Sequence, residues 1–396
     1  AHKKGASLRM LRTFAGLPTG RETGTFLALD FGGTNVRALR IRLDGSGKYK
    51  VESKVAKPLT LPGVYDYVCA DATAEEMFDF LAEIIDEAIE GDHDTKYLLG
   101  HTFSFPSEQT NLCNARLITW TKEFATQGVE GKVVNDLLED ALMRRGMKNV
   151  VPVAVINDTV AVLLAAAYKR EHTYIGSIYA TGQNTCYYEE FADGSEPSTV
   201  INMESGGFGK LPFSKYDEIL DRESEQPGAQ RLEKMVSGRY LGTLYGAALA
   251  DLLGADGIYP FSSIELSEII TDAHLDRHAA GAVIEAKTGM TFTAAERTLL
   301  QELATAVIIR SARIVGATFV AIIQHRMGEN ELENQFIAVD GSVYEKVPLV
   351  AHHLRGVLDT LLLDEAVNVK IILENAGSAL GAALAAAMTG RNESIK

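Results

Sequence analysis

The most regular feature of the chain is an apolar run that ends in one acid and two glycines. Residues 26–29 are all apolar, as expected of a fully buried strand, and Asp30, Gly32 and Gly33 follow them. Over residues 36–43, apolar side chains are interleaved with arginines, which indicates a second strand. Together the two runs predict a β-hairpin with a tight glycine turn.

The turn of this hairpin, residues 30–35, has the composition of a phosphate site. Its glycines leave backbone N–H groups unobstructed beside a carboxylate, which suits a phosphate and the Mg²⁺ ion that accompanies it. An ordinary glycine hairpin that binds nothing explains the same residues equally well, because short motifs often occur by chance. Other parts of the sequence are needed to distinguish a phosphate site from a hairpin that binds nothing.

A second hairpin of the same kind is predicted in the other half of the chain. A strand is expected over residues 175–180, a turn over residues 181–185, and a returning strand over residues 186–191. The two glycine turns lie about 150 residues apart. Such a repeat predicts a duplicated α/β architecture with a nucleotide between two lobes.

The remaining periodicities predict helices that alternate with strands. Apolar residues recur at helical spacing after Thr73, which we expect to cap a helix that stops at Gly91. The segment before Thr23 is expected to be a short helix and a loop. The other helices are expected over residues 133–145, 160–168, 230–250, 294–325 and 378–388, and the other strands over residues 49–55, 97–105, 115–119, 151–156, 336–339 and 369–373.

One acid stands between a buried strand and a buried helix. The apolar run 151–156 ends in Asn157, Asp158 and Thr159, and an alanine-rich helix follows at once. Asp158 or Thr159 could cap that helix, because its first N–H groups need acceptors. Alternatively, Asp158 accepts a proton from a substrate hydroxyl while Asn157 holds the same substrate. The local residues support both interpretations.

Lys122 follows Thr121 and the only tryptophan of the chain, Trp120, where a short strand ends. A single lysine is usually a surface charge, but ligand-binding groups are often placed where strands end. Lys122 is therefore a candidate ligand-binding residue.

Length and charge narrow the possible functions. A chain of 396 residues is expected to form two domains, and its net charge of −15 argues against binding nucleic acid or an anionic membrane. The three cysteines form no CxxC pair, which argues against a disulfide framework or a zinc site and fits a reducing cytoplasm. We find no signal-peptide pattern and expect no apolar run long enough to span a bilayer.

Nine motifs follow one another between about residue 17 and residue 388: LALDFGGTNVR, FSFPSEQ, TWTKEF, VINDTVAVLLAAAY, ATGQNTCYYEE, INMESGGFG, PGAQRLEKMVSGRYLG, AVDGSVYEKVP and ENAGSALGAALAAAM. In these motifs and in their order the chain resembles the eukaryotic-type hexokinases, and its length resembles that of a single-unit hexokinase or glucokinase. The resemblance implies the α/β actin-like (ribonuclease H-like) ATPase fold, duplicated, with a deep cleft between two lobes that closes on the sugar.

The resemblance also implies how the chain divides into lobes and what it does. A small lobe is expected over residues 26–156 plus 376–396, and a large lobe over residues 1–25 plus 157–375. The implied activity is ATP-dependent phosphorylation, with Mg²⁺, of the 6-hydroxyl of glucose and other hexoses, the first step of glycolysis. The expected partners are the hexose and ATP, with no nucleic acid or membrane, and the chain could be a monomer or a homodimer.

Residue roles follow from the same motifs. The implied catalytic residues are Lys122 and Asp158, the latter as the general base that takes the proton of the 6-hydroxyl. The implied hexose-binding residues are Ser104, Thr121, Lys122, Asn157, Asp158, Asn184, Glu204 and Glu233. The residues implied around the nucleotide are Asp30, Gly32, Gly33, Thr34, Asn35, Arg37, Thr181, Gly182, Gly341, Ser342, Gly377 and Ser378, with Asp30 also near Mg²⁺.

The chain departs from the family pattern in three places. Gln183 stands where a small residue or cysteine is usual, Ser205 stands where an aromatic residue is common, and the stretch 208–216 is short. These departures bear on affinity and specificity and remove no proposed catalytic group.

Three other classes of protein are alternatives to a hexokinase. Bacterial sugar kinases of the repressor-related group generally carry a cysteine-rich zinc motif, which this chain lacks. An actin-like or chaperone ATPase would have the phosphate turns without the Thr121, Lys122 and Asp158 set. A hexokinase-like sensor that binds sugar without turnover is the alternative in a different class. We expect an active enzyme, because Asp158, Lys122 and both phosphate turns are present.

Overall fold

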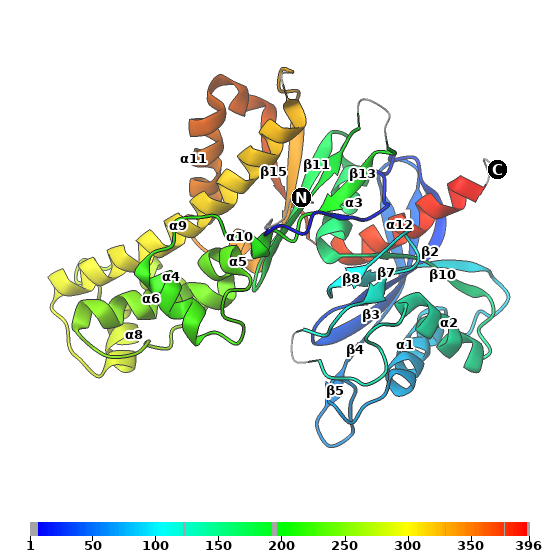
Figure 1. Cartoon of the computed structure of the whole chain (residues 1–396), viewed down its shortest axis with the longest axis horizontal. Coiled ribbons are helices and arrows are strands. Elements are labelled where there is room, and N and C mark those ends of the chain that lie inside the picture. The colour runs from blue at the N-terminus through cyan, green and yellow to red at the C-terminus, as the bar shows by residue number, and fades with distance from the viewer. Residues whose placement is uncertain (1–6, 122–123, 192–195, 329, 376, 394–396) are drawn as a thin grey trace. The chain divides into compact units, whose positions relative to one another are not determined.

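The computed structural model describes residues 7–121, 124–191, 196–328, 330–375 and 377–393, and the side chains among these up to residue 389. The chain forms two compact units (Figure 1). Unit 1 comprises Ala1–Met10, Ser177–Thr185 and Met203–Asn375, and unit 2 comprises Leu11–Gly176, Cys186–Asn202 and Ala376–Lys396. These units are defined by contacts within the chain, and the lobe bounds expected from the family stay a prediction.

Unit 2 contains a five-stranded sheet in the order β10-β7-β2-β3-β4. The central strand β2 (Thr23–Phe31) pairs antiparallel with β3 (Asn35–Asp44) and parallel with β7 (Tyr97–Phe103). On the outside, β4 (Tyr49–Pro58) is antiparallel to β3, and β10 (Val150–Ile156) is parallel to β7. The predicted first hairpin is therefore confirmed as β2 and β3.

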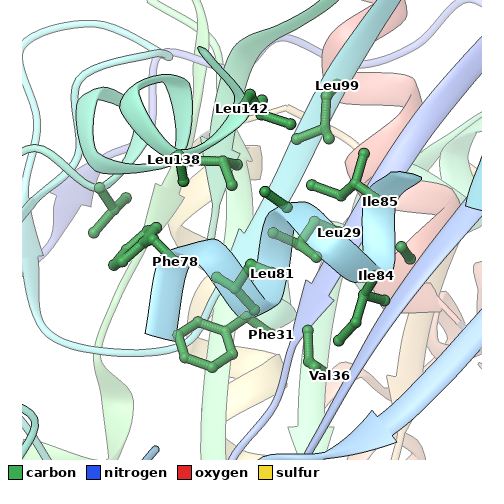
Figure 2. Packing of buried hydrophobic residues seen from close by; sticks show 14 of the residues in the cluster. Leu29, Phe31, Val36, Phe78, Leu81, Ile84, Ile85, Leu99, Leu138 and Leu142 are labelled. Atoms are coloured by element: carbon green, nitrogen blue, oxygen red, sulfur yellow. The ribbon is translucent and has the colours of Figure 1, made fainter. Parts of the chain in front are cut away.

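One face of this sheet is covered by helices α1 (Ala74–Ala88) and α2 (Val134–Arg144). Thr73 caps α1 as predicted, in a capping box with Glu76. Figure 2 shows leucine, isoleucine and phenylalanine side chains of both helices around Leu29 of β2. Side chains alternate along a strand, so odd-numbered residues of β2 fill this core and even-numbered ones point to the other face.

The other face is covered by helices α3 (Asp158–Lys169) and α12 (Gly377–Glu393). Helix α12 lies so close to β7 that a Cβ at Gly100 would lie 1.8 Å from the carbonyl oxygen of Ala382. Only glycine fits there, because no side-chain carbon can approach a backbone oxygen that closely. Helix α3 thus begins on the face of β2 to which Asp30 belongs.

A second sheet repeats the topology of the first. Its order is β1-β13-β12-β11-β14-β15, with β12 and β13 antiparallel and β14 and β15 parallel. Its last five strands therefore correspond to β4-β3-β2-β7-β10, and the division between the units passes through β11 and β12. This repeat confirms the predicted duplicated α/β fold. The strands are β1 (Leu11–Arg12), β11 (Thr173–Tyr179), β12 (Gln183–Glu189), β13 (Thr199–Asn202), β14 (Gln335–Asp340) and β15 (Val369–Leu373).

The other elements are mostly helices of unit 1. They are α4 (Lys215–Glu223), α5 (Arg231–Val236), α6 (Gly238–Leu253), α7 (Ser263–Thr271), α8 (His278–Thr288), α9 (Ala294–Met327), α10 (Ser342–Lys346) and α11 (Val350–Leu362), with 3₁₀ turns η1 (Ser205–Gly207) and η2 (Leu363–Asn368). Unit 2 adds the short pairs β5 (Thr60–Leu61) with β6 (Tyr65–Asp66) and β8 (Ser107–Glu108) with β9 (Arg116–Leu117).

Two predicted helices are wrong. The one expected over residues 230–250 is two helices, α5 and α6, separated by Ser237 in an extended conformation. The described part of the segment before Thr23 contains strand β1 and no helix. Met10 (φ 52°) and Phe14 (φ 59°) have left-handed backbone angles that an α-helix excludes. The two-residue strand between them instead extends the sheet beside β13.

Helix α9 corrects the expectation about apolar runs. Among the described residues it alone is long and apolar enough to cross a membrane, judged by length and composition only. Half of its most apolar window is buried inside the protein, as in a helix of a protein core. The helix is therefore weak support for a membrane span.

Candidate functional site

In unit 2, the turn of the first hairpin is open to a ligand. The last paired residues are Phe31 and Val36, and the Gly32 N–H closes the turn by donating to the Asn35 carbonyl oxygen at 3.2 Å. Gly33, Thr34 and Asn35 are exposed. A phosphate group could therefore reach the backbone of the predicted nest.

Asp30 and Arg37 face each other across this hairpin, with Oδ2 and Nη1 3.4 Å apart. Burial raises the pKa of the Asp30 carboxyl, and the nearby Asp158 carboxylate raises it further. The positive charges of Arg37 and Lys54 act in the opposite direction. Arg37 is thus engaged with Asp30, and a cation bound at Asp30 would relieve the cost of its buried charge.

Three neighbouring strands bring candidate residues to one edge of the sheet. Asp30 of β2 and Ile156 of β10 both pair with Thr102 of β7. Two residues beyond these paired positions, the chain reaches Ser104 after β7 and Asp158 after β10. Because the strands are parallel, their carboxyl ends meet at this edge, where α/β proteins commonly bind ligands. The proposed base, one sugar-binding residue and the proposed metal ligand are thereby assembled in one unit.

Asn157 caps helix α3. Its Oδ1 accepts from the Thr159 N–H at 3.0 Å, and Asp158 Oδ1 accepts from the same N–H at 2.7 Å. The prediction that Asp158 or Thr159 is the cap is therefore wrong, since Asn157 takes the N-cap position and Asp158 is the first helical residue. The amino end of a helix carries partial positive charge, so it favours a carboxylate at this place.

Thr121 lies half-buried beside the tryptophan of unit 2. The Trp120 indole N–H donates to the Thr126 carbonyl oxygen at 2.9 Å, and its ring packs against Phe105 and Phe124. This packing fixes the chain just before Thr121. Lys122 lies outside the described residues, so its predicted role stays a prediction.

In unit 1, the second hairpin is held by the start of helix α6. The N–H groups of Gly238 and Arg239 donate to the carbonyl oxygens of Ala180 and Thr181 at 2.8 and 3.2 Å. Inside the turn, the Ala180 N–H donates to the Gly182 carbonyl oxygen at 2.9 Å. The turn therefore has a fixed backbone, with Thr181 exposed.

The predicted large-lobe hexose residues gather around this turn. The Gln183 N–H donates to Glu233 Oε2 at 2.9 Å, which ties helix α5 to the hairpin. Asn184 Oδ1 accepts from the Ser205 N–H at 3.2 Å, so Asn184 lies next to the segment that carries Glu204. The segments that carry Asn184, Glu204 and Glu233 thus lie next to one another in one unit, and their hexose-binding role stays a prediction.

The residues predicted around the adenosine fall in both units. Gly341 (φ 132°) precedes Ser342 and the short helix α10 in unit 1, and a Cβ on it would lie 2.4 Å from the Tyr179 carbonyl oxygen. Only glycine allows this close approach to β11. Gly377 and Ser378 begin α12 in unit 2, where the Ser378 carbonyl oxygen accepts from Thr102 Oγ1 at 3.0 Å. Their nucleotide role stays a prediction.

Comparison with known proteins identifies the family. Two family models, both described as Hexokinase, match residues 1–168 and 174–388. Hexokinase-1 of Schizosaccharomyces pombe is 32% identical over 411 residues, which cover 96% of this chain and 82% of the relative. The chain belongs to the hexokinase family. It also matches rat hexokinase-2, at 34% identity over 414 residues that cover 98% of this chain but only 44% of that protein.

Solved hexokinase structures share the fold. A crystal structure of a hexokinase matches with a TM-score of 0.86 at 32% identity, covering 96% of this chain and 89% of that one. The hexokinase of Schistosoma mansoni complexed with glucose matches with a TM-score of 0.78 at 30% identity and the same coverage. These matches confirm the predicted actin-like two-lobed class of fold. The ROK hexokinase of Thermus thermophilus, at 18% identity and a TM-score of 0.55, shares the fold alone.

The sequence does not predict two features of this candidate site. The N–H groups of Gly238 and Arg239 hold the second hairpin, a role that their motif does not indicate. The side chain of Gln183 was seen only as a departure from the family pattern, yet it is buried and hydrogen-bonded within the site. The signal that the sequence offers is a glutamine directly after the glycine of a phosphate-type turn.

Proposed function

We propose that this chain transfers the γ-phosphoryl group of ATP to the 6-hydroxyl of glucose and other hexoses. The observation that carries the proposal is the alignment of Asp30, Ser104 and Asp158 at the carboxyl ends of three neighbouring parallel strands. It joins a phosphate-type turn to a carboxylate base within one unit. Phosphoryl transfer mainly requires in-line positioning, charge neutralisation and one base near the acceptor oxygen.

In unit 2, Asp158 would take the proton of the 6-hydroxyl. Its carboxylate is fixed by the Thr159 N–H at 2.7 Å, so one oxygen is anchored to the start of α3. Ser104, Thr121, Lys122 and Asn157 would bind the hexose around it. No covalent intermediate is needed, because a deprotonated hydroxyl attacks phosphorus directly.

The residues present fit Mg²⁺. Asp30 supplies a largely buried carboxylate near a second one on Asp158, and oxygen is the ligand atom that Mg²⁺ prefers. Among the described residues no group of three or more His, Cys, Asp or Glu could hold a metal ion. Asp30 would therefore hold Mg²⁺ together with water and nucleotide phosphates, the usual arrangement for this ion. The ion would supply shielding of the phosphate charge when it is bound.

In unit 1, Asn184, Glu204 and Glu233 would hold the other sugar hydroxyls, which need paired donors and acceptors. Thr181 and Gly182 would bind phosphate, as would the turn Gly32-Gly33-Thr34-Asn35 of unit 2. Gly341 and Ser342, with Gly377 and Ser378, would surround the adenosine. Closure of the lobes on the sugar, a role in glycolysis and a cytoplasmic location belong to the same proposal.

A direct assay tests it. Purified protein is mixed with glucose, ATP and Mg²⁺, and ADP release is followed alongside glucose 6-phosphate. The expected result is stoichiometric formation of both products, abolished when glucose is omitted. Glucose binding without ADP release would instead leave a sugar sensor.

A further inference from the structure

The two unusual residues of the second half are hydrogen-bonded to each other. Ser205 Oγ donates to Gln183 Oε1 at 3.1 Å, and Gln183 Nε2 donates to Thr185 Oγ1 at 3.0 Å. Gln183 is only 3% exposed and Ser205 only 1%. Since polar groups buried at this depth need partners, each of these hydrogen bonds is costly to remove.

Gln183 touches the segment of every hexose-binding residue proposed in unit 1. Its backbone N–H donates to Glu233 itself at 2.9 Å. Its side-chain oxygen accepts from Ser205, the neighbour of Glu204, and its side-chain nitrogen reaches Thr185, the neighbour of Asn184. Through its backbone and its side chain, Gln183 thus links its own strand β12 to two segments that are distant in the sequence.

The contacts around Glu204 explain why such a link is needed. Glu204 has φ 51°, a left-handed conformation that is costly for a residue with a side chain. On its two sides, the Met203 N–H donates to the Thr185 carbonyl oxygen at 3.1 Å and the Ser205 N–H donates to Asn184 Oδ1 at 3.2 Å. The Gln183–Ser205 hydrogen bond is a third tie across the same loop, and together the ties hold the strained residue.

We infer that Gln183 and Ser205 form a positioning pair that sets the affinity of this site for hexose. The inference rests on the proposed function, because it concerns how Asn184, Glu204 and Glu233 are aimed at the sugar. An amide suits position 183, since its oxygen accepts from Ser205 while its nitrogen donates to Thr185. A carboxylate lacks the donor and an aliphatic side chain lacks both.

The test compares Gln183→Leu, Ser205→Ala and the double variant. Gln183→Leu keeps the volume and removes both side-chain hydrogen bonds, and Ser205→Ala removes one. We expect each single variant to raise the KM for glucose about tenfold, the scale of one unsatisfied buried group, with kcat and the KM for ATP within about threefold of wild type. The double variant is expected to be no worse than Gln183→Leu, because the two act as a unit. Ser205→Thr keeps the hydroxyl and is expected to retain most of the affinity.

Gln301→Leu is the matched control. Gln301 is another buried glutamine of unit 1, and its Nε2 donates to the carbonyl oxygens of Ile269 and Asp272 at 2.8 and 2.9 Å. Its loss is expected to lower the melting temperature without changing the KM for glucose. A purely structural role for Gln183 would give the same pattern as Gln301→Leu.

The outcomes separate the pair from the function on which it depends. Glucose binding is also measured by calorimetry, without turnover, and the folded fraction of each variant by circular dichroism. Wild-type activity with an unchanged glucose KM in folded Gln183→Leu and Ser205→Ala would overturn the positioning pair alone. A wild-type protein that neither binds glucose nor releases ADP would overturn the proposed function and the pair with it.

Discussion

The two glycine hairpins occupy equivalent strands of the two sheets but are held in different ways. The first turn is exposed and is closed by its own backbone, from the Gly32 N–H to the Asn35 carbonyl oxygen. The second is held by hydrogen bonds to other segments: the N–H groups at the start of α6 donate to it, and the carboxylate of Glu233 accepts from it. The repeated topology therefore does not repeat the local structure.

The charges differ as well. Asp30 and Arg37 flank the first turn, and the negative charge of Asp158 raises the pKa of Asp30. Residues 180–185 of the second turn contain no charged side chain, and the acid there comes from α5. Under the proposed function the two hairpins have different roles: the first would bind phosphate and the metal ion, and the second would connect its phosphate-type turn to the proposed hexose residues. Four substitutions at the proposed site test this division.

Asp158→Asn is expected to have the largest effect. The amide keeps an oxygen that can accept from the Thr159 N–H, and Asn157 still caps α3, so the fold is preserved. Loss of a general base typically costs two to four orders of magnitude, and we expect kcat to fall about 1,000-fold. Glucose binding, measured by calorimetry, should change far less than ADP release.

Asp136→Asn is the control for this variant. Asp136 is also an acid in the first turn of a helix, α2, but it is exposed and lies outside the proposed site. Its replacement should leave turnover unchanged. Undiminished turnover in Asp158→Asn would remove Asp158 from the role of base.

Asp30→Asn is expected to lower turnover and to raise the stability of the ligand-free protein. Burial raises the pKa of Asp30, so the folded protein binds this proton more tightly than the unfolded chain does, and the ionised carboxylate costs stability at neutral pH. An amide removes that cost, and the melting temperature of the ligand-free protein should rise. Turnover should fall on the order of 100-fold, with a higher Mg²⁺ requirement, because a charge that faces the phosphate is lost.

Asp44, at the opposite end of the same hairpin, provides a control whose pKa is shifted in the opposite direction. The backbone N–H of Ser46 holds the pKa of the Asp44 carboxyl below its usual value. That group adds stability above its unfolded pKa and loses it as the pH falls. Asp44→Asn should therefore lower the melting temperature and leave turnover unchanged. An equal loss of turnover in both variants would contradict the metal role of Asp30.

Alanine in each turn should separate the two hairpins. A Cβ on Gly182 would lie 2.9 Å from Glu233 Oε2, so that carboxylate has to move. We expect Gly182→Ala to raise the KM for glucose about tenfold through Glu233, and to raise the KM for ATP as well, because Gly182 is proposed to bind phosphate. A Cβ on Gly32 would meet the Asn35 carbonyl oxygen at 3.1 Å, which disturbs the phosphate turn alone. Gly32→Ala should raise the KM for ATP about tenfold and spare that for glucose. Equal changes of both KM values in Gly32→Ala would contradict the proposed division.

The sequence predicted both hairpins and their flanking strands because their signals are local. A buried apolar run, a glycine pair and an alternating return strand each depend on near neighbours only. Local signals also predicted that strands end near Asp30 and Ile156. Once the pairing of β2, β7 and β10 is known to be parallel, these ends place Asp30 and Asp158 at one edge of the sheet.

What the sequence could not provide is the long-range contact. The helix predicted over residues 230–250 breaks at Ser237 because the N–H groups of Gly238 and Arg239 turn to the hairpin at residues 180–181. The bond between Gln183 and Ser205 joins positions that each looked anomalous alone. Local periodicity does not predict such pairs, because they depend on residues that are distant in the sequence.

The substitution with the smallest expected effect on activity lies in the core of unit 2, at a histidine whose burial should make the folded protein less stable at low pH. His101 of β7 is completely buried beside the rings of Phe31 and Phe103, and neither ring nitrogen has a hydrogen-bond partner among the described residues. Burial lowers its pKa to about 3 from 6.5. Below pH 6.5 the unfolded chain therefore takes up a proton that the folded protein refuses, and stability falls down to about pH 3. Buried Tyr179 and Tyr245 of unit 1, whose pKa values are raised by burial, stay neutral throughout this range.

His101→Phe should remove this sensitivity without changing turnover. Relative to wild type, the variant should gain about 2 kcal/mol of unfolding free energy between pH 7.5 and pH 5, because protonation of the unfolded histidine no longer favours unfolding. The carboxylates of the protein contribute equally to both proteins, so the difference isolates His101. Denaturant unfolding followed by the fluorescence of Trp120, the only tryptophan and a residue of unit 2, measures the quantity. A difference between the two proteins that does not change with pH would show that His101 is protonated, or finds a partner, inside the folded unit.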